Sequence, residues 1–587
     1  MISQSIPLTA KGMDLQEALH HYFGFSSFKG EQQAIIQNIL HGNNTFVIMP
    51  TGGGKSMCYQ LPALMMEGTA IIVSPLIALM KNQVDAIRYV SENGNVAHFL
   101  NSSLTKNEIA QVKRDVVSGS TKMLYVAPES LTKQENIDFL SSVPVSFFAI
   151  DEAHCISQWG YDFRPSYRKL EVLKKMFPSI PILAMTASAI PLVQQDIIKQ
   201  LLLKKPSIIS SSFLRPNLSY KVQKLSTKWQ GLRHLIENIK GSLIIYCSTR
   251  NNVSQLVNIL QDYGYSVGQY HAGMPYITRQ EVQDNWMRNQ LRIVVCTSAF
   301  GMGINKPDVR AVIHFDLPNS IEQYYQEAGR AGRDGQPAQA ILLFQQNDWD
   351  YWENLQEKKF PSIELIKKAY QDLADFVQLP VGMGEKQEYP FDFETFYTHF
   401  KWDKIVAQSA LQFIEQEGHI KFTASSFKPS LVQVIADRNT IDTFIQDQPI
   451  AGAVLQLMLR SYGGILDSPQ NINEKLLASL LQRDIEFVQK NLWYLAQTGL
   501  IIFEQKISQP VVQFLWNRAS ASFMKIDLDN YQIRKKAFEK RVKHFTDYIW
   551  AKDIGCRSAY LASYFGEKNP SKCKICDLCH THGSYTF

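Results

Sequence analysis

The chain has 587 residues, of which 45% are hydrophobic and 19% charged, and its formal net charge is +6. A chain of this length is too long for one core, so several domains are expected, and the mild positive charge permits a polyanionic partner without requiring one. The sequence has no run of 18 apolar residues, and residues 1–4 lack a basic-then-apolar signal pattern, so we expect a cytoplasmic protein with no membrane association.

The first feature along the chain is a glycine loop between a strand and a helix. Residues 14–40 have a helical pattern with a break at 24–29, and the apolar residues 45–48 predict a buried strand. Glycines placed after such a strand let backbone N–H groups and a helix start face a polyphosphate. The strict pattern places glycine where Met49 stands, and an ordinary glycine turn is the alternative. The residues assigned to this loop are Thr51, Gly52, Gly53, Gly54, Lys55, which would reach the β- and γ-phosphates, and Ser56, which would ligate Mg²⁺.

A pair of acids follows the buried-strand run 146–150. Asp151 at the carboxyl edge of a parallel strand can hold Mg²⁺ through water, and Glu152 can orient and deprotonate the attacking water. A solvated turn is the alternative. Together with the glycine loop, the pair predicts hydrolysis of a nucleoside triphosphate.

Strands and helices alternate from residue 45 to about 203 and again from about 218 to 344, which predicts two doubly wound parallel sheets. The second unit has no phosphate loop, and it ends in Gln-Glu-Ala-Gly-Arg-Ala-Gly-Arg-Asp-Gly at 326–335. Arg330 and Arg333, three apart on a short helix, would project to one side and reach the γ-phosphate as arginine fingers in cis. A salt-bridged surface is the alternative. The expected strands are 70–73, 123–126, 146–150 and 182–185 in the first unit and 243–246, 292–296 and 311–315 in the second.

The segment 155–165 after the acid pair has no helical or strand period and contains aromatic residues, glycine, proline and an arginine. Trp159 and Phe163 could stack on bases while Arg164 contacts phosphate. The alternative is a loop held in place by burying its aromatic side chains.

An internal repeat at an offset of 81 residues begins after the second unit. Each copy reads helix, turn, helix, glycine cap, short strand, polar tip and second strand, which predicts a winged helix with second helices near 403–417 and 484–498. Neither helix is basic, and 484–498 carries only Lys490. We expect one module to bind duplex DNA and the other to act in packing or as a spacer, although such modules also serve protein contacts. The matching residues are Leu411, Gln416, Gly418, Ile420 and Phe422 against Leu492, Gln497, Gly499, Ile501 and Phe503.

The last segment combines basic residues with four cysteines. Residues 531–574 hold eleven Lys and Arg against four Asp and Glu. Four thiolates at this spacing can close a tetrahedron around Zn²⁺, which makes the site structural. The basic helix would track phosphates or form a solvated face. The expected zinc ligands are Cys556, Cys573, Cys576 and Cys579.

These motifs resemble the RecQ family of DNA helicases, within helicase superfamily 2. The resemblance covers roughly 14–345 and 525–580, and its motifs include 49–56, 73–81, 151–160, 299–307 and 326–335. It implies ATP-driven 3′-to-5′ translocation on single-stranded DNA with separation of duplex DNA in recombination and repair. A monomer is expected, with a single-stranded-DNA-binding protein or a topoisomerase as candidate protein partners.

The resemblance also assigns residues. It places adenine recognition at Phe25, Lys29 and Gln32, and it makes the loop with Trp159, Phe163 and Arg164 couple DNA contact to hydrolysis. Lys29 stands where the family has arginine, so planar stacking is lost and only charge remains. Gln326 joins the arginines as a catalytic residue, and the further DNA contacts expected are Ser248, Thr249 and Arg250.

The expected fold is α/β, with two RecA-like lobes of parallel sheet, winged-helix-like α+β modules and a small helical zinc-binding module. In familiar members the zinc module follows the second lobe directly, whereas here about 180 residues intervene. An RNA helicase, a translocase that does not separate strands, and a winged-helix DNA-binding regulator with a decayed motor are the alternatives. The expected domains are lobe 1 at 1–207, lobe 2 at 208–346, module A at 347–435, module B at 436–522 and the zinc module at 523–587.

Overall fold

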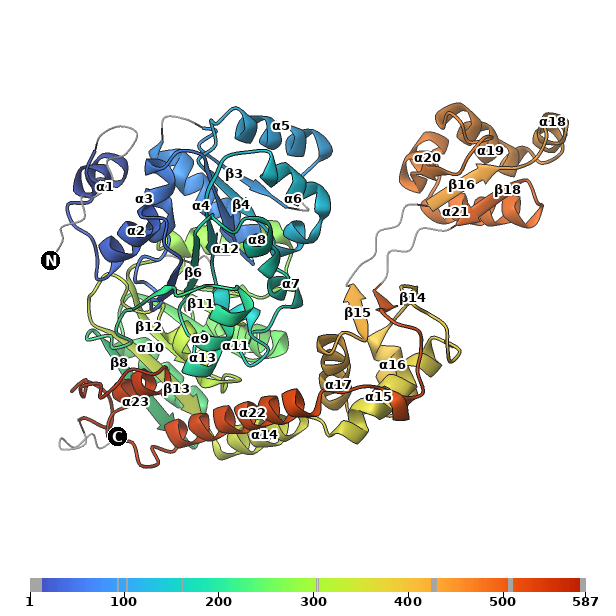
Figure 1. Cartoon of the computed structure of the whole chain (residues 1–587). Helices are drawn as coiled ribbons and strands as arrows, with labels where there is room; N and C mark the ends of the chain where they lie inside the picture. Colours follow the sequence, from blue (N-terminus) through green and yellow to red (C-terminus); the bar gives the residue numbers. More distant parts are fainter. Residues whose placement is uncertain are drawn as a thin grey trace. The chain divides into compact units, whose positions relative to one another are not determined.

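The computed structural model describes residues 13–580 except 76, 92–93, 102–103, 161, 302–303, 305, 424–429 and 505–509. The chain forms two compact units (Figure 1). The first unit contains Met1–Glu357 and Leu528–Phe587, and the second contains Lys358–Asp527. The second unit is therefore an insertion into the sequence of the first.

The first lobe is a seven-stranded sheet in which every pair is parallel. Its inner strands β1, β2 and β6 are buried at every position and mostly apolar, as expected where helices cover both faces of a parallel sheet. In sheet order the strands are β3 (Ala97–Leu100), β4 (Met123–Val126), β2 (Thr69–Val73), β5 (Val145–Ile150), β6 (Ile182–Thr186), β1 (Thr45–Ile48) and β7 (Ser207–Ser210). The helices are α1 (Leu15–Phe23), α2 (Gln32–Leu40), α3 (Met57–Met65), α4 (Ile77–Val90), α5 (Lys106–Val117), α6 (Gln134–Ser141), α7 (Pro165–Arg168), α8 (Glu171–Met176) and α9 (Pro191–Gln200), with short 3-10 turns η1 (Pro128–Thr132) and η2 (Ala153–Ile156).

The second lobe is a six-stranded parallel sheet. In sheet order its strands are β10 (Val267–Tyr270), β11 (Ile293–Cys296), β9 (Ser242–Tyr246), β12 (Val309–His314), β13 (Ala338–Phe344) and β8 (Leu218–Lys224). Its helices are α10 (Lys228–Asn238), α11 (Arg250–Asp262), α12 (Tyr276–Met287) and α13 (Ile321–Ala328).

Both predicted parallel sheets are confirmed. The seven strands expected beyond the first correspond to β2, β4, β5, β6, β9, β11 and β12, and the expected strand 45–48 is β1. The remaining strands of the two sheets were not predicted. The strand β7 pairs with β1, so the first sheet extends to Ser210 rather than ending at the expected boundary of 207.

The zinc module is built from two chain segments. The helix α14 (Gln346–Lys358) follows the second lobe, whereas α22 (Leu528–Ile549) and α23 (Arg557–Tyr564) follow the inserted unit. Ring contacts join α14 to α22 and to the residue that follows it. Trp352 and Phe545 of α22 lie 5.1 Å apart between centroids, and Trp349 lies 5.6 Å from Trp550, directly after α22. Figure 1 shows the two helices side by side. The residues from 347 to Glu357 therefore pack in the first unit, and the expected assignment of that stretch to module A is wrong.

Module A of the second unit is a helical cluster with a three-stranded antiparallel sheet, in the order β14-β19-β15. Asp403 caps α17 by accepting from the N–H groups of Ile405 and Val406, and Gly418, with φ 78°, follows its end. The elements are α15 (Ile363–Phe376), β14 (Glu388–Pro390), α16 (Phe393–His399), α17 (Lys404–Gln416), β15 (Ile420–Thr423), β19 (Val511–Phe514) and η3 (Ala521–Phe523).

Module B repeats this local design around its own core. Asp484 caps α21 by accepting from the N–H of Phe487, and Gly499, with φ 76°, follows its end. Its sheet order is β17-β16-β18, and both pairings are antiparallel. The elements are β16 (Ser430–Val434), α18 (Arg438–Asp447), α19 (Pro449–Ser461), β17 (Gln470–Ile472), α20 (Glu474–Leu481), α21 (Ile485–Gln497) and β18 (Ile501–Glu504).

The two predicted winged-helix-like modules are confirmed, and their second helices lie within a residue of the predicted bounds. The two neighbouring strands of module A's repeat, β15 and β16, do not pair with each other. The strand β15 pairs with β19, and β16 pairs with β18. We call these paired strands the wing strands, β15 and β19 in module A and β16 and β18 in module B. Module B is therefore inserted between the two wing strands of module A, and the domain boundaries expected at 435 and 522 do not coincide with the edges of these sheets.

Among the described residues, no helix combines the length and the apolar character needed to cross a membrane.

Candidate active site

The phosphate loop lies between the end of β1 and the start of α3, in the context that the sequence predicted. Gly52 and Gly54 have φ of 87° and 82°, which is left-handed backbone that favours glycine. A Cβ on Gly54 would lie 2.4 Å from Gln32 Nε2. The Lys55 ammonium donates to the carbonyl oxygen of Met49 at 3.1 Å, so it lies over the loop. In this position Lys55 can exchange that carbonyl for a phosphate oxygen.

Gln32 is held by the phosphate loop. Its amide nitrogen donates to Gly54 O at 3.1 Å, and its amide oxygen accepts from the Lys29 N–H at 2.9 Å. Gln32 therefore links the segment assigned to adenine recognition with the loop assigned to the phosphates. The Phe25 ring is 54% exposed, which leaves its face open for stacking.

The acid pair begins where β5 ends. Asp151 N donates to Val73 O at 2.9 Å on the neighbouring strand, and Asp151 Oδ1 accepts from Glu152 N at 2.9 Å. Glu152 is buried and has φ 48°, a left-handed conformation that is uncommon outside glycine. A solvated turn does not fit a buried glutamate in this conformation.

The electrostatics of the acid pair set it apart from surface carboxylates. Burial, and next the charge of Glu152, raise the pKa of Asp151 to about 6, while Lys55 opposes the shift. His154 Nδ1 lies 3.0 Å from Thr186 Oγ1 and 3.4 Å from Glu152 Oε2. Burial lowers the pKa of His154 to about 4, so the imidazole is neutral at pH 7 and its contact with Glu152 is not an ion pair.

A cavity of about 250 Å³ opens between the phosphate loop and the second lobe. Arg333 lines it, and a Cβ on Gly52 would lie 3.2 Å from Arg333 Cγ. An arginine of the second lobe thus reaches the phosphate loop of the first. The residues from the two lobes and the segment between them that line the cavity include Lys29, Thr51, Gly52, Gly53, Arg215, Asn217 and Arg333.

The two predicted finger arginines differ in position. Both follow the end of α13, in residues 329–335, a segment that we call the arginine turn. The prediction that a short helix carries them is therefore wrong. Arg333 donates to Ile304 O at 2.5 Å and faces the cavity. Arg330 is buried and donates to the carbonyl oxygen of Gly301 inside the second lobe. Gln326 lies on α13, half-buried. Arg333 is therefore the arginine placed to meet a phosphate.

The predicted aromatic loop lies beside the acid pair. Arg164 donates to Pro75 O at 3.2 Å, after the end of β2, and to Asp162 Oδ2 at 3.3 Å. Trp159 packs in part against the core, and Phe163 is half-buried. The loop is thus fixed near the carboxyl ends of the strands without full burial of Trp159 and Phe163.

The other predicted DNA contacts lie at the carboxyl end of β9. Ser248, Thr249 and Arg250 are exposed. Ser248 N and Oγ donate to Asp316 Oδ2 at 2.8 and 3.0 Å, and Thr249 caps α11 by accepting from Asn252 N at 3.1 Å. An exposed helix start of this kind can bind a backbone phosphate.

The four predicted zinc ligands lie together, with sulfur atoms within 4.8 Å of one another. Cys556 Sγ is 3.5 Å from Cys573 Sγ and 3.9 Å from Cys576 Sγ. Tetrahedral Zn²⁺ with bonds of about 2.3 Å places sulfurs about 3.8 Å apart, so the cluster fits zinc. Lys536, Lys540 and Lys543 form an exposed basic stripe on α22.

Arg215 is a cavity residue that the sequence did not predict. It lies in the segment between β7 and β8, and it belongs to neither the phosphate loop nor the arginine turn. A single arginine in a connecting segment is part of no motif with a characteristic spacing. Its role at the cavity can therefore be recognised only once the fold is known.

Two parallel-sheet lobes with a phosphate loop, an acid pair and an opposing arginine define the class of two-lobed helicase motors. Models of two families match accordingly: DEAD/DEAH box helicase over residues 29–197 and helicase conserved C-terminal domain over 227–335. Two more match outside the lobes, namely RecQ helicase winged-helix domain, Bacteroidota, over 432–505 and RecQ zinc-binding over 518–580. The chain belongs to the RecQ family of helicases.

Relatives agree with this assignment. The chain is 44% identical over 376 residues to the ATP-dependent DNA helicase RecQ of Pasteurella multocida, covering 64% of this chain and 58% of that protein. It is 40% identical over 378 residues to the probable ATP-dependent DNA helicase RecS of Bacillus subtilis, covering 64% of this chain and 74% of that protein. Over the three RecQ proteins of Pasteurella, Haemophilus and Bacillus, the chain spans 56–61% of their length.

Proposed function

We propose that this protein is an ATP-dependent DNA helicase that translocates 3′-to-5′ on single-stranded DNA and separates duplex DNA in recombination and repair. The observation that carries the proposal is the position of Arg333, which lines one cavity together with Gly52 and lies so near that a Cβ on Gly52 would be 3.2 Å from its Cγ. An arginine of one lobe thus lies beside the phosphate loop of the other. Hydrolysis in a cleft between two lobes can change their separation, which is what a translocase needs.

Each residue of the cleft has a role in this proposal. Lys55 and the loop N–H groups hold the β- and γ-phosphates, and Ser56 and Asp151 would hold Mg²⁺, which neutralises phosphate charge when bound. Glu152 accepts the proton of the attacking water. Arg333 neutralises charge that develops on the γ-phosphate. Arg330 fixes the arginine turn to the second lobe through its bond to Gly301 O, and Gln326 on α13 is assigned as a further catalytic residue.

Nucleic acid is assigned to the face where the strands end. Trp159 and Phe163 would stack on bases, Arg164 would contact a phosphate, and residues 248–250 would hold the backbone on the second lobe. Arg164 also bonds to the main chain after β2, so a DNA contact at this loop can shift the segment next to the acid pair. Binding and hydrolysis are coupled in this way.

The finer assignments follow from the same proposal. We infer duplex contact through one of the two modules of the second unit, action as a monomer, a cytoplasmic location, and a single-stranded-DNA-binding protein or a topoisomerase as protein partner. An RNA helicase or a translocase that does not unwind remains the alternative within the same chemistry. A DNA-binding regulator with a decayed motor is disfavoured because Lys55, Asp151, Glu152, Arg330 and Arg333 are all present.

The first test separates the motor from the regulator. Glu152→Gln keeps the size of the side chain but removes the proton acceptor, so kcat for ATP should fall at least about a hundredfold while ATP binding persists. Lys55→Ala should also abolish turnover, and DNA binding should survive. Steady-state ATPase assays and nucleotide-binding titrations measure both, and Asp138→Asn on the exposed face of α6 is the matched control. Wild-type turnover in Lys55→Ala would remove the phosphate loop from the mechanism.

The second test identifies the substrate. ATPase stimulation is compared for single-stranded DNA, duplex DNA and RNA, and strand separation is measured on duplexes with a 3′ or a 5′ tail. The proposal expects stimulation by single-stranded DNA and unwinding from the 3′ tail only. Stimulation by RNA alone contradicts the choice of DNA, and translocation without strand separation favours the non-unwinding alternative.

A further inference from the structure

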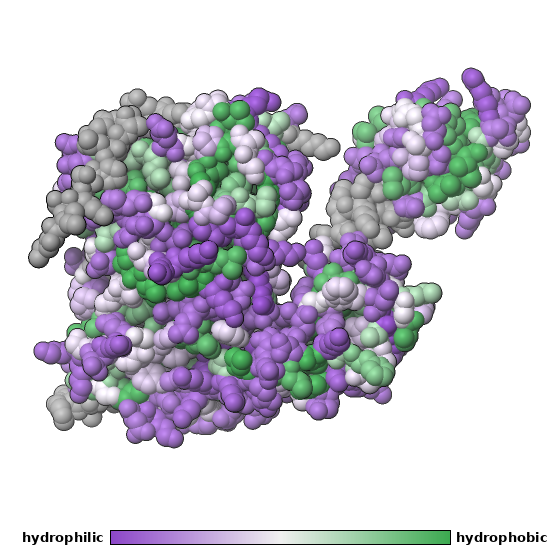
Figure 2. Space-filling view, in the orientation of Figure 1, coloured by the Kyte–Doolittle hydropathy of each residue, from purple (hydrophilic) through white to green (hydrophobic). Residues whose placement is uncertain are grey.

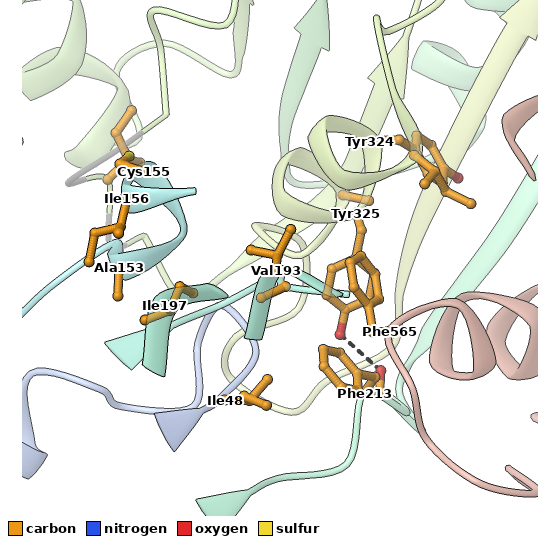
Figure 3. Close-up of a cluster of buried hydrophobic side chains, with 14 of the residues drawn as sticks. Ile48, Ala153, Cys155, Ile156, Val193, Ile197, Phe213, Tyr324, Tyr325 and Phe565 are labelled. Carbon is orange, nitrogen blue, oxygen red and sulfur yellow. Dashed lines mark hydrogen bonds between the residues drawn. The ribbon is translucent and has the colours of Figure 1, made fainter. Parts of the chain in front are cut away.

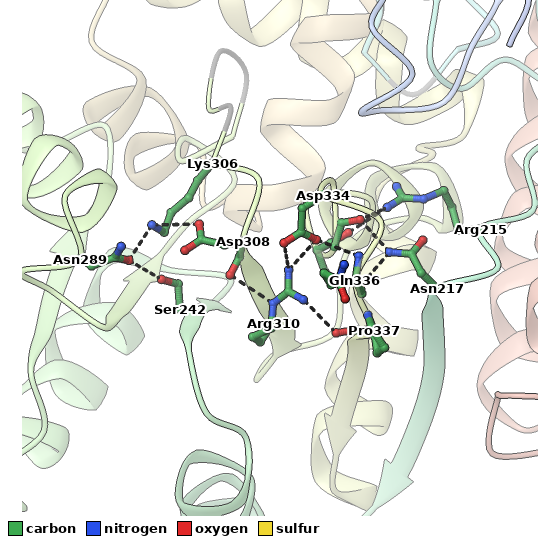
Figure 4. A network of polar contacts seen from close by, with 12 residues as sticks. Arg215, Asn217, Ser242, Asn289, Lys306, Asp308, Arg310, Asp334, Gln336 and Pro337 are labelled. Atoms are coloured by element: carbon green, nitrogen blue, oxygen red, sulfur yellow. Dashed lines mark hydrogen bonds and ion pairs between the residues drawn. The ribbon is translucent and has the colours of Figure 1, made fainter. Parts of the chain in front are cut away.

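Arg215 bonds to both lobes at once. Its guanidinium NH1 donates to Thr51 O of the phosphate loop and to Gly329 O of the arginine turn, both at 3.3 Å. NH2 donates to Ala331 O at 3.1 Å and to Gly332 O at 2.8 Å. Figure 4 shows Arg215 directed at the arginine turn, next to Asn217. A single side chain therefore closes a bridge across the nucleotide cavity.

The bridge depends on the fork shape of the guanidinium group. Four carbonyl oxygens on two lobes accept from two terminal nitrogens, an arrangement that a single ammonium group cannot reproduce. These carbonyls are neutral, so their bonds do not offset the positive charge that Arg215 brings to the cavity. That charge, after burial and the charge of Arg330, helps lower the pKa of Arg333 to about 9. A polyphosphate would balance the charges of Arg215 and Arg333 together.

The backbone that carries Arg215 is fixed by the zinc module. Glu567 accepts from Phe213 N at 2.9 Å and from Ser212 Oγ at 3.0 Å. The carbonyl of Phe213 accepts from Tyr325 OH at 3.0 Å (Figure 3). The backbone N–H of Phe213 thus bonds to the zinc module, and its carbonyl bonds to α13, the helix that precedes the arginine turn.

Packing reinforces these bonds. The rings of Phe213 and Phe565 stack at 4.9 Å between centroids and 17° between planes. Phe213 is 3% exposed and Phe565 is 1% exposed, so the contact is fully desolvated. Phe565 and Glu567 lie between the zinc ligands Cys556 and Cys573 in the sequence, and the position of both depends on a folded zinc module.

We propose that Arg215 is a positioning residue that holds the two halves of the nucleotide cavity together, and that the zinc module sets its position through Phe213. The proposal rests on the proposed ATP hydrolysis and extends it to the regulation of the same site. Because the bonds of Arg215 span the lobes, they form in full only when the lobes are closed. Arg215 therefore stabilises the closed state, in which hydrolysis occurs, relative to the open state. It is expected to affect the hydrolysis step more than the binding of the nucleotide.

The first variant is Arg215→Lys, which keeps the charge and loses the fork. Charge-assisted hydrogen bonds are strong enough that kcat should fall about ten- to a hundredfold, while KM for ATP changes by less than about threefold. Arg288→Lys, on an exposed arginine after α12, is the matched control with unchanged kcat. A wild-type kcat in Arg215→Lys overturns the positioning role. Lys55→Ala then shows which proposal is at fault. If Lys55→Ala also hydrolyses ATP at the wild-type rate, the proposed hydrolysis at the phosphate loop fails. If Lys55→Ala is inactive, only the positioning role of Arg215 fails.

The second variant tests the zinc module. Glu567→Ala should lower kcat, as Arg215→Lys does, while one zinc per chain is retained. Glu567→Gln can still accept from Phe213 N, so it should recover part of the lost kcat. Glu539→Ala, an exposed glutamate of α22, is the control. In the double variant Arg215→Lys with Glu567→Ala, the two losses should not multiply, because both break one pathway. Losses that multiply, or a wild-type kcat with zinc retained, overturn the coupling. If Glu567→Ala loses zinc, Phe565→Leu replaces it with the same criteria.

Discussion

At the scale of single residues, the carboxyl group of Asp151 is the most informative site. It must be ionised to hold a cation, yet the structure places it where ionisation is disfavoured by burial and by Glu152. A group whose folded pKa is raised above its unfolded value stabilises the protein fully at low pH, and that stability is lost as pH rises through the folded pKa. In the nucleotide-free protein, the charged Asp151 is therefore destabilising above pH 6.

This gives a prediction for Asp151→Asn. The amide mimics the protonated acid, so the variant should lose ATPase activity and yet be more stable than the wild type. The gain in the free energy of unfolding should be absent below the ordinary aspartate pKa of 3.8 and should grow up to a pH of about 6. Above that pH it should level off at about 3 kcal/mol, since one pKa unit corresponds to about 1.4 kcal/mol. Thermal unfolding of the nucleotide-free protein measured from pH 4 to pH 8 checks it, with Asp138→Asn as the control. A gain that is independent of pH would assign the effect to packing instead.

Residue-level prediction from the sequence worked where a motif is continuous. The phosphate loop was predicted because strand, loop and helix follow one another within about twenty residues, and Asp151 because it directly follows the apolar strand run 146–150. Arg330 and Arg333 were expected on one helix face, but the helix ends at Ala328, and Gly332, with φ 61°, turns the chain. The two arginines therefore do not share the expected direction: Arg330 bonds to Gly301 O and Arg333 lines the cavity. The local backbone, which the spacing does not specify, decides where each side chain points.

At the scale of elements, the sequence does not show which strand each wing strand pairs with. The strands β15, β16, β18 and β19 are all short and rich in β-branched or aromatic residues, so alternation identifies them as strands without naming their partners. The strand β15 pairs with β19, which lies beyond the whole of module B in the sequence. Non-local strand pairing is set by the tertiary fold, which no local pattern contains.

Module B has a surface of its own. Its exposed large hydrophobic side chains include Ile450, Ile485, Trp493, Tyr494 and Ile502, and Figure 2 shows hydrophobic residues on its visible face. Between 430 and 504 it carries five Lys and Arg against eight Asp and Glu. An acidic module repels a phosphate backbone, so of the two modules this one is the poorer candidate for duplex DNA.

The register of the wing gives a prediction for this module. Thr423 and Val511 are paired residues of β15 and β19, so replacing 424–510 with Asn-Gly should close a two-residue hairpin. We expect the shortened protein to fold, to bind zinc and to keep its single-stranded-DNA-stimulated ATPase within about twofold, because module B has a separate core. Circular dichroism, metal analysis and ATPase assays test this; a control that deletes 430–504 and keeps the flanking residues should behave alike. Aggregation of both proteins would mean that module A needs module B to fold.

At the scale of the whole molecule, the zinc module joins segments that are far apart in the sequence. Asp577 accepts from Val222 N at 3.0 Å on β8, and Ser219 Oγ donates to Ile575 O at 2.6 Å. On the first lobe, Gln194 Nε2 reaches Phe565 O at 3.4 Å. Arg557 forms an ion pair with Asp577 at 2.6 Å, which ties α23 to the residues between the zinc ligands. The module thus contacts both lobes, and its folding matters to the motor as a whole.

The last prediction concerns removal of the metal. In Cys576→Ser a hydroxyl replaces a buried thiol, and because serine is a poor zinc ligand at neutral pH, the variant should hold less than one zinc per chain. Zinc binding supplies folding free energy on the order of several kcal/mol, so the first unit should melt at lower temperature and proteolysis should begin after α22. Since Ser219 and Val222 lose their partners, unfolding should spread to the second lobe before the first. Cys247→Ala, at a buried cysteine of the second lobe outside the cluster, should keep its zinc. Full zinc in Cys576→Ser, or wild-type protein purified without zinc, would contradict the four-cysteine site.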